Sequence, residues 1–178
     1  MPDGRRMTQS GAVIDFIETH MPGECPLIPD DAWENAEMRR IMWIIAADVQ
    51  PYQNIPFIIQ AMTEWGMVQA KPTKHPLRLH FIRREFSALE RILEQCSGTC
   101  SVGDALSLAD CFLIPQVRNA LLAGIDLHGE FPVMGRVWDH VIAQPAVAAV
   151  IEDAGGIIQK VTYDQQKFTS AVDSRSEN

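Results

Sequence analysis

Apolar residues recur every three or four positions along most of this chain, the spacing that places side chains on one face of an α-helix. Residues 102–127 combine this pattern with a capping box, in which Ser107 accepts from the backbone of Asp110 and Asp110 accepts from the backbone of Ser107. Few charges lie on any face of the segment that follows, and Gly124 is placed to end it. We therefore expect a central, nearly enclosed helix, bent at Pro115.

The same spacing predicts helices on both sides of this segment, over residues 8–20, 55–68, 76–95, 131–143 and 145–154. A long helix is also expected from Asp31, with a kink or break at Pro51 and Pro56, because proline has no backbone donor. After the turn signature at residues 2–4, residues 5–7 are long enough only for a lone strand without a ladder partner. The pattern predicts an all-α body of five to seven helices with a vestigial strand in front.

Composition narrows the classes of function. With 178 residues, 47% apolar content and a mean hydropathy of -0.04, the chain is long enough for one well-cored globular domain plus appendages. The net charge of -8, without a Lys/Arg run longer than two, argues against nucleic acid or an anionic membrane as the main partner. No apolar segment reaches the roughly 20 residues that span a bilayer. We expect a cytoplasmic protein.

Catalytic and metal-binding motifs are not apparent. The four cysteines and five histidines show neither C-x-x-C nor H-x-x-x-H spacing, which favours free thiols over a metal site. The sequence also contains no recognisable nucleophile–base pair and no phosphate loop. We therefore assign no catalytic residue and no metal ligand.

Two segments carry candidate binding residues. Gln9, Ser10 and Gly11 open the first helix, where free backbone N–H groups favour an anion, although Ser10 could simply cap the helix. The helix broken by prolines carries polar side chains that either line a ligand cleft or satisfy the freed backbone. These side chains are Asp48, Gln50, Gln53 and Asn54.

The central stretch GDALSLADCFLIPQVRNALLAGIDL resembles the zeta class of glutathione transferases, the maleylacetoacetate isomerase family. Further stretches agree in order over residues 3–150: DG, QSGAVIDFIE, PLIP, VQPYQN and FSALERIL. The S-x-x-D box is common to glutathione transferases in general and supports the fold. The runs PQVRNA and VQPYQN point to the zeta class.

The resemblance implies a domain organisation. Residues 1–20 would be the last strand and helix of a thioredoxin-like domain, 21–30 a linker, 31–155 the helical C-terminal glutathione-transferase domain and 156–178 a tail. The family's thiol-activating segment, SSCxW-like, has no counterpart in these 178 residues, so we expect a truncated member that is inactive by itself. Family dimers use the helix after Asp31, and we expect a weaker homodimer here, with an exposed patch at Val13, Phe16 and Ile17.

The resemblance also implies ligands and the residues that bind them. Gln9 and Ser10 match the pair that binds the γ-glutamyl end of glutathione, and Gln50 matches a position that lines the pocket for a small acidic electrophile. We include Asn54 in that pocket. The family tends to carry an arginine where this chain has Leu122, and a dicarboxylate needs a cation. Arg118, one turn earlier, is a candidate substitute, and a solvated surface arginine is the alternative.

Two functions therefore remain open. The first is glutathione-dependent cis–trans isomerisation and conjugation, in the family's case a step of tyrosine and phenylalanine catabolism. The second is a non-catalytic helical module for interaction or dimerisation.

Overall fold

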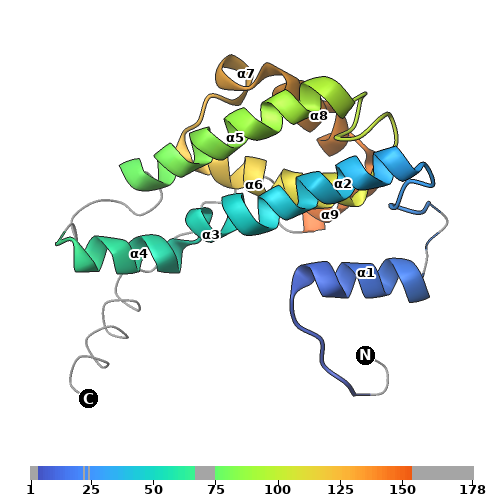
Figure 1. The fold of residues 1–178 in the computed structure, drawn as a ribbon, viewed down its shortest axis with the longest axis horizontal. Coiled ribbons are helices and arrows are strands. Elements are labelled where there is room, and N and C mark those ends of the chain that lie inside the picture. Colours follow the sequence, from blue (N-terminus) through green and yellow to red (C-terminus); the bar gives the residue numbers. More distant parts are fainter. Residues whose placement is uncertain (1–3, 22, 24, 67–74, 154–178) are drawn as a thin grey trace.

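The computed structural model describes residues 4–21, 23, 25–66 and 75–153, and this part of the chain is helical (Figure 1). Within it the backbone forms no strand, only an isolated bridge between Ser97 and Gly103. The all-α prediction is confirmed. The helices are α1 (Ser10–His20), α2 (Ala32–Ile44), the π-helix η1 (Ile45–Val49), α3 (Gln50–Gln53), α4 (Ile55–Glu64), α5 (Pro76–Cys96), α6 (Leu108–Ala123), α7 (Leu127–Glu130), α8 (Pro132–Ile142) and α9 (Pro145–Asp153).

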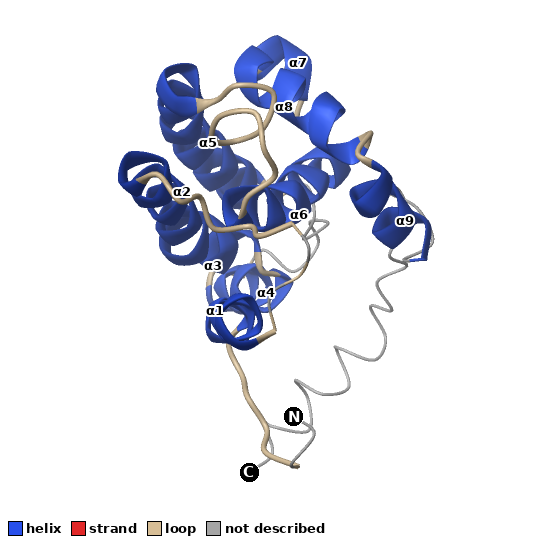
Figure 2. Ribbon diagram, turned by 90° about the vertical axis from the view of Figure 1, so that its right-hand side faces the viewer, coloured by secondary structure: helices blue, strands red, loops and turns tan. Residues whose placement is uncertain are grey.

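Helix α6 is central, as its sequence predicts. It runs through the middle of the bundle in Figure 2 and contacts α2, α5 and α8. Both halves of the capping box form at its start, between Ser107 and Asp110, and Gly124 ends it in the left-handed conformation with φ 92°. The helix continues through Pro115. Half of its sixteen residues are buried, which is why its sequence carries so few charges.

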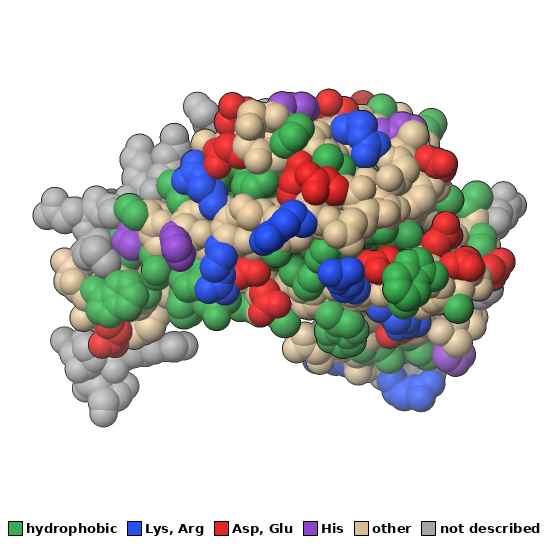
Figure 3. All heavy atoms as spheres, turned by 45° about the horizontal axis from the view of Figure 1, so that its top comes forward, with side chains coloured by type: hydrophobic (Ala, Val, Ile, Leu, Met, Phe, Trp, Pro, Cys, Tyr) green, Lys and Arg blue, Asp and Glu red, His purple; other side chains and the backbone are tan. Residues whose placement is uncertain are grey.

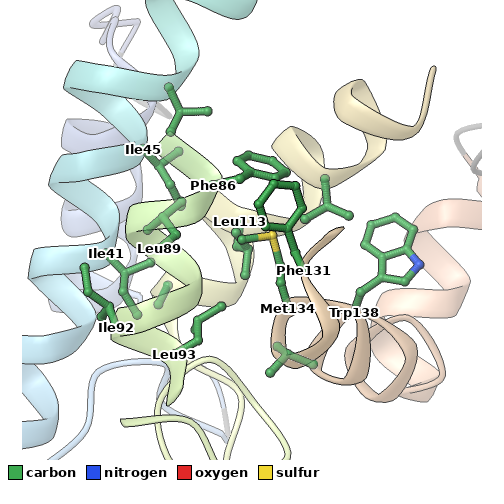
Figure 4. Close-up of a cluster of buried hydrophobic side chains, with 14 of the residues drawn as sticks. Ile41, Ile45, Phe86, Leu89, Ile92, Leu93, Leu113, Phe131, Met134 and Trp138 are labelled. Atoms are coloured by element: carbon green, nitrogen blue, oxygen red, sulfur yellow. The ribbon is translucent and has the colours of Figure 1, made fainter. Parts of the chain in front are cut away.

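The hydrophobic core lies where α2, α5, α6 and α8 face one another (Figure 4). Ile41 of α2, Leu89 of α5 and Leu113 of α6 are almost completely buried. Phe86 of α5 packs edge to face against Phe131, which precedes α8, with ring centroids 5.6 Å apart. Aromatic pairs in this geometry add stability beyond the area that they bury.

The long helix that starts after Asp31 breaks, as predicted, near its two prolines. The Asp31 carboxylate accepts from the backbone of Trp33 and Glu34 and begins α2. A π-turn and the four-residue α3 follow, and the chain becomes extended at Asn54, with ψ 126°, before α4 begins. The sequence did not predict the π-helix, α3 or α7. Among the described residues, seven α-helices of nine or more residues match the expected number, and α3 and α7 add two short ones.

Helix α1 lies at the edge of the bundle (Figure 1), and none of its residues is buried. Its inner side meets α6, since a Cβ added to Gly11 would lie 3.8 Å from Phe112 Cζ. Glu18 accepts a hydrogen bond from the backbone of Leu27 at 3.0 Å, which ties α1 to the connector. The predicted patch at Val13, Phe16 and Ile17 is half-buried to exposed. Residues 5–7 are irregular rather than a strand, and no neighbouring strand pairs with them in the described chain.

Some expectations fall outside the described residues or stay predictions. The turn at residues 2–3, the end of the predicted helix at 67–68 and the tail at 156–178 lie outside the described residues. The proposed domain boundaries stay predictions. In the described ranges, the helices are all too short or too polar to cross a membrane.

Candidate functional site

The first candidate site is the start of α1. Gln9 precedes the helix with φ 71° and ψ 110°, and it is the one non-glycine residue with positive φ in the described chain. L-residues rarely adopt this conformation, and such strain concentrates at binding sites. Ser10 is the first helical residue rather than the cap, so the interpretation of Ser10 as a simple cap does not hold here. Both side chains are exposed.

This end of α1 presents donors to solvent beside α6. The N–H of Val13 is the first to bond within the helix, to Gln9 O at 3.0 Å, so the N–H groups of residues 10–12 have no helical partner. Gly11, in the same turn, lies against Phe112 of α6. The site is thus an exposed helix N-terminus next to the central helix, an arrangement that suits an anion.

The second candidate site is the interrupted segment that contains α3. Gln50 is the exposed first residue of α3, and Asn54 is exposed at the break, where its side chain does not cap α4. Gln53 is buried instead, and its Nε2 donates to Gln116 O of α6 at 3.4 Å. Gln53 thus donates to a backbone carbonyl of α6 and not to one freed by Pro51 or Pro56, whereas Gln50 and Asn54 are exposed to solvent. Both interpretations of this segment stay predictions.

Arg118 and Leu122 lie on α6, one helical turn apart, and both are half-buried. The contact between Gln53 and Gln116 brings the end of α3 to α6 two residues before Arg118. Leu121 packs against the hydrophobic core, whereas Leu122 is not among the residues packed there. That the predicted pocket residues Gln50, Asn54, Arg118 and Leu122 share one pocket stays a prediction.

A separate hollow of about 610 Å³ lies along the outer face of α5. It is lined by Pro76, Leu79, His80, Arg83, Arg84 and Ser87 and contains none of the predicted site residues. Its arginines are paired within the protein: Arg83 forms two hydrogen bonds with Glu130, and Arg84 bonds Glu85. On the face shown in Figure 3, basic and acidic side chains are interspersed, so no basic surface gathers there.

The cysteines are free thiols and do not form a metal cluster within the described residues. Burial, and secondarily the charge of Glu37, raises the pKa of Cys96 to about 11. Burial also raises the thiol pKa of Cys111, with Asp110 and Glu18 contributing. Raised pKa values keep these thiols protonated at neutral pH and make them poor nucleophiles.

Sequence reasoning missed the buried polar contacts between distant segments. Arg78 of α5 is buried, which lowers its pKa, and its Nε donates to Gln53 O at 3.1 Å. Gln116 of α6 accepts at its backbone carbonyl from the side-chain amide of Gln53, 63 positions away, and no local pattern in the sequence indicates this bond. Only the three-dimensional arrangement reveals such pairs.

The comparisons with known proteins all indicate the same family. The family described as "Glutathione S-transferase, C-terminal domain" matches residues 56–154. A probable maleylacetoacetate isomerase 2 of Drosophila melanogaster is 34% identical over 147 residues, which are 83% of this chain and 60% of that protein. The maleylacetoacetate isomerase of Mus musculus is 34% identical over 142 residues, 79% of this chain and 61% of that protein. The chain thus spans about three fifths of the length of these relatives.

Solved structures agree. A maleylacetoacetate isomerase from Anaeromyxobacter dehalogenans, with bound dicarboxyethyl glutathione and citrate, matches with a TM-score of 0.75 and 30% identity over 93% of this chain and 71% of that one. A maleylpyruvate isomerase from Pseudomonas aeruginosa matches with a TM-score of 0.76 and 25% identity over 92% of this chain and 80% of that one.

Proposed function

We propose that this chain is the helical part of a glutathione-dependent isomerase of small unsaturated dicarboxylic acids. The chain belongs to the glutathione S-transferase family by its C-terminal domain, and it is similar to zeta-class maleylacetoacetate isomerases. The family resemblance implies that this activity would belong to aromatic amino acid catabolism in the cytoplasm. Glutathione would supply the thiolate for the isomerisation. The residues of this chain would bind and orient the ligands.

The observation that carries the proposal is the backbone of Gln9. A strained non-glycine residue persists only where the surrounding structure or a function requires it. The family resemblance matches Gln9 to a position that binds glutathione, which supports a function as the reason for the strain. The free N–H groups of the next turn suit the α-carboxylate of a γ-glutamyl group, and the side-chain carbonyl of Gln9 can accept from its ammonium group. Ser10 adds a hydroxyl at the same helix end.

The acidic substrate would bind near α3 and α6. Gln50 and Asn54 offer exposed amides, and Arg118 offers the guanidinium that the pocket otherwise lacks at Leu122. A guanidinium binds a carboxylate through two parallel hydrogen bonds and fixes its orientation. We propose Arg118 as the residue that holds one carboxylate of the substrate.

Isothermal titration of the 178-residue chain with glutathione, and separately with malonate as a dicarboxylate probe, tests both sites. We expect Gln9→Ala to weaken glutathione at least tenfold and Arg118→Ala to weaken malonate by a similar factor. Thr8→Ala and Arg91→Ala are matched exposed controls. Unchanged affinity in the two site variants, or no binding by the unmodified chain, would contradict the proposal.

We also propose that these 178 residues alone do not catalyse isomerisation, because the family's thiol-activating segment has no counterpart in them. An assay of maleylacetoacetate isomerisation by the purified chain with glutathione tests this. Measurable turnover that depends on enzyme concentration would refute the proposal.

The second candidate function, a dimerisation module, is favoured by the surface of α2. Trp33 is 73% exposed and Trp43 is 69% exposed. Ten residues, about 2.8 turns, separate them, so they lie about 15 Å apart along α2 and about 80° apart around its axis. Two copies of α2 packed antiparallel about a two-fold axis would place Trp33 of one copy near Trp43 of the other, the self-complementary arrangement of a symmetric dimer.

Light scattering coupled to size exclusion tests the dimer. We expect a concentration-dependent dimer that Trp33→Ala and Trp43→Ala shift to monomer. Trp65→Ala is the matched control, since Trp65 is also exposed but follows α4. A monomer at all concentrations would rule out this function.

A further inference from the structure

Tyr52 joins the four-residue helix α3 to α5 through its aromatic ring. The ring stacks on that of Phe81 of α5, with centroids 4.1 Å apart and planes inclined by 9°. Phe57 of α4 meets the Tyr52 ring edge to face, with centroids 5.6 Å apart and an interplanar angle of 82°. Tyr52 and Phe81 are both half-buried. A single side chain of α3 therefore contacts both α5 and α4.

Phe81 is itself held by its neighbours on α5. The guanidinium carbon of Arg84 lies 5.0 Å from the centroid of the Phe81 ring, a cation–π contact. Arg84 also forms an ion pair with the buried Glu85. His80 meets Phe81 edge to face, with ring centroids 5.5 Å apart. These contacts give Tyr52 a well-defined surface on which to stack.

Two hydrogen bonds also hold α3. Arg78 Nε donates to the backbone carbonyl of Gln53 at 3.1 Å, and Gln53 Nε2 donates to Gln116 O at 3.4 Å. The first bond goes to the backbone at the end of α3 and does not depend on the side chain at position 53. The second is longer than a typical N–H···O bond and correspondingly weak. We therefore expect the stack of Tyr52 on Phe81 to restrict the rotation of α3 more than the Gln53 side chain does.

The rotation of α3 about its axis decides where Gln50 and Asn54 lie. Asn54 N donates to Gln50 O at 3.2 Å, so these residues are one helical turn apart on the same side of α3. Tyr52 follows Gln50 by two residues, which places its side chain about 200° further around the axis. The ring thus holds the side of α3 opposite the two exposed amides. Any turn of α3 would move both amides together.

We propose that Tyr52, through its stack on Phe81, is a positioning residue for the dicarboxylate pocket. It fixes the rotation of α3, and with it the direction in which Gln50 and Asn54 present their amides to the substrate beside Arg118. This role rests on the proposed function, in which these amides and Arg118 bind the acidic substrate. Tyr52 acts through α3, so its ring is required and its hydroxyl is not.

Titration of the 178-residue chain with malonate tests this role. Tyr52→Leu and Phe81→Leu each keep an apolar side chain but remove one ring of the stack, and we expect each to weaken malonate binding about fivefold. Tyr52→Phe keeps the ring and should bind malonate as tightly as the unmodified chain. Trp65→Leu is the control and should also bind normally, because Trp65 is 59% exposed and follows α4.

A second titration separates positioning from a general loss of stability. In Gln50→Ala/Asn54→Ala the amides that Tyr52 positions are absent, and Arg118 supplies the remaining affinity for malonate. Adding Tyr52→Leu to this background should therefore not weaken malonate binding further. A further loss of about fivefold there, as large as in the unmodified background, would overturn the positioning role. So would a loss in Tyr52→Phe equal to that in Tyr52→Leu.

The failures of the two proposals are distinguishable. If the unmodified chain binds no malonate, the proposed function fails and the positioning role fails with it. If the unmodified chain binds malonate and the folded Tyr52→Leu and Phe81→Leu variants bind it equally well, only the positioning role fails. Circular dichroism before each titration shows which variants are folded. Phe81→Leu removes the same stack from the other helix and decides the test if Tyr52→Leu does not fold.

Discussion

Glu90 of α5 caps a helix that begins 42 residues further along the chain. Its Oε2 accepts from the backbone N–H of Met134 at 2.9 Å, and its Oε1 accepts from that of Val133 at 2.7 Å. Phe131, the residue before α8, has no side-chain acceptor, and Pro132 has no N–H. The carboxylate therefore replaces a local cap and joins α5 to the start of α8.

Replacing this carboxylate should weaken the bundle. In Glu90→Ala, two N–H groups at a partly buried helix start lose a charged acceptor, and we expect the free energy of unfolding to fall by about 2 kcal/mol. The melting temperature should drop by roughly 4–8 °C. Glu94→Ala, at an exposed position of the same helix, should change little. Equal melting temperatures for the two variants would show that the cap does not contribute.

Replacing Asp110 should lower the free energy of unfolding more than replacing Glu90. Its Oδ1 accepts from the backbone of Ser101, and its Oδ2 accepts from both the backbone and the hydroxyl of Ser107. Asp110→Ala leaves buried donors unpaired, and we expect a loss of about 3 kcal/mol in chemical denaturation. Asp110→Asn keeps the shape and one acceptor oxygen and should lose less. The reverse order would contradict this assignment of the hydrogen bonds.

Gln9 should show opposite effects on stability and binding. Glycine adopts positive φ without strain, so Gln9→Gly should raise the free energy of unfolding by about 1 kcal/mol while it weakens glutathione binding. Thr8→Gly, where no strain needs relief, should not stabilise the chain. Calorimetry and titration of the same samples measure both quantities. A destabilised Gln9→Gly would show that the backbone at Gln9 is not strained.

The thiols should differ in reactivity. Because burial raises the pKa of Cys96 to about 11, roughly one thiol in a thousand is ionised at pH 8, and iodoacetamide should modify exposed Cys25 long before Cys96. The raised value also means that the protonated thiol favours the folded state, so this contribution to stability is present below pH 9 and is lost as the pH rises toward 11. Peptide mass spectrometry measures the order in which Cys25 and Cys96 are labelled. Equal labelling of Cys25 and Cys96 at pH 8 in the folded chain would contradict it.

Leu122 offers a gain-of-function test. An arginine there would restore the cation that the resemblance leads us to expect, and Leu122 is half-buried without packing on the core, so the longer side chain should be tolerated. We expect Leu122→Arg to bind malonate about tenfold or more tightly than the unmodified chain. Leu122→Gln, which is polar but neutral, is the control. An equal gain in both variants would show that charge at this position is irrelevant.

Local signals predicted α6 best. The capping box at Ser107 and Asp110, the left-handed Gly124 and the apolar stripe all act within a few residues, and the structure confirms each of them. The same holds for the start of α2 at Asp31 and for the break near Pro51 and Pro56. Helix caps and the missing backbone donors of proline act on residues nearby in the chain, so the sequence is sufficient to locate these helix starts and breaks.

The candidate site was predictable only in part. The resemblance drew attention to Gln9 and Ser10, but the positive φ of Gln9 is a property of the folded backbone. The polar segment at α3 was recognised, yet which of its amides turns inward was left open. Gln53 is buried rather than Gln50 because α5 and α6 enclose that side of α3, and both helices are distant in sequence.

The seven longer helices, their order and the family could be predicted from the sequence, since periodicity, caps and prolines act locally and short runs such as PQVRNA can be read directly. Which buried polar groups meet depends on the folded structure. Glu90 reaches α8, and Gln53 reaches α6, only because packing of the apolar faces brings these segments together. A polar pair across such a distance leaves no periodic signal in either segment, because each partner is an isolated polar residue until the core forms.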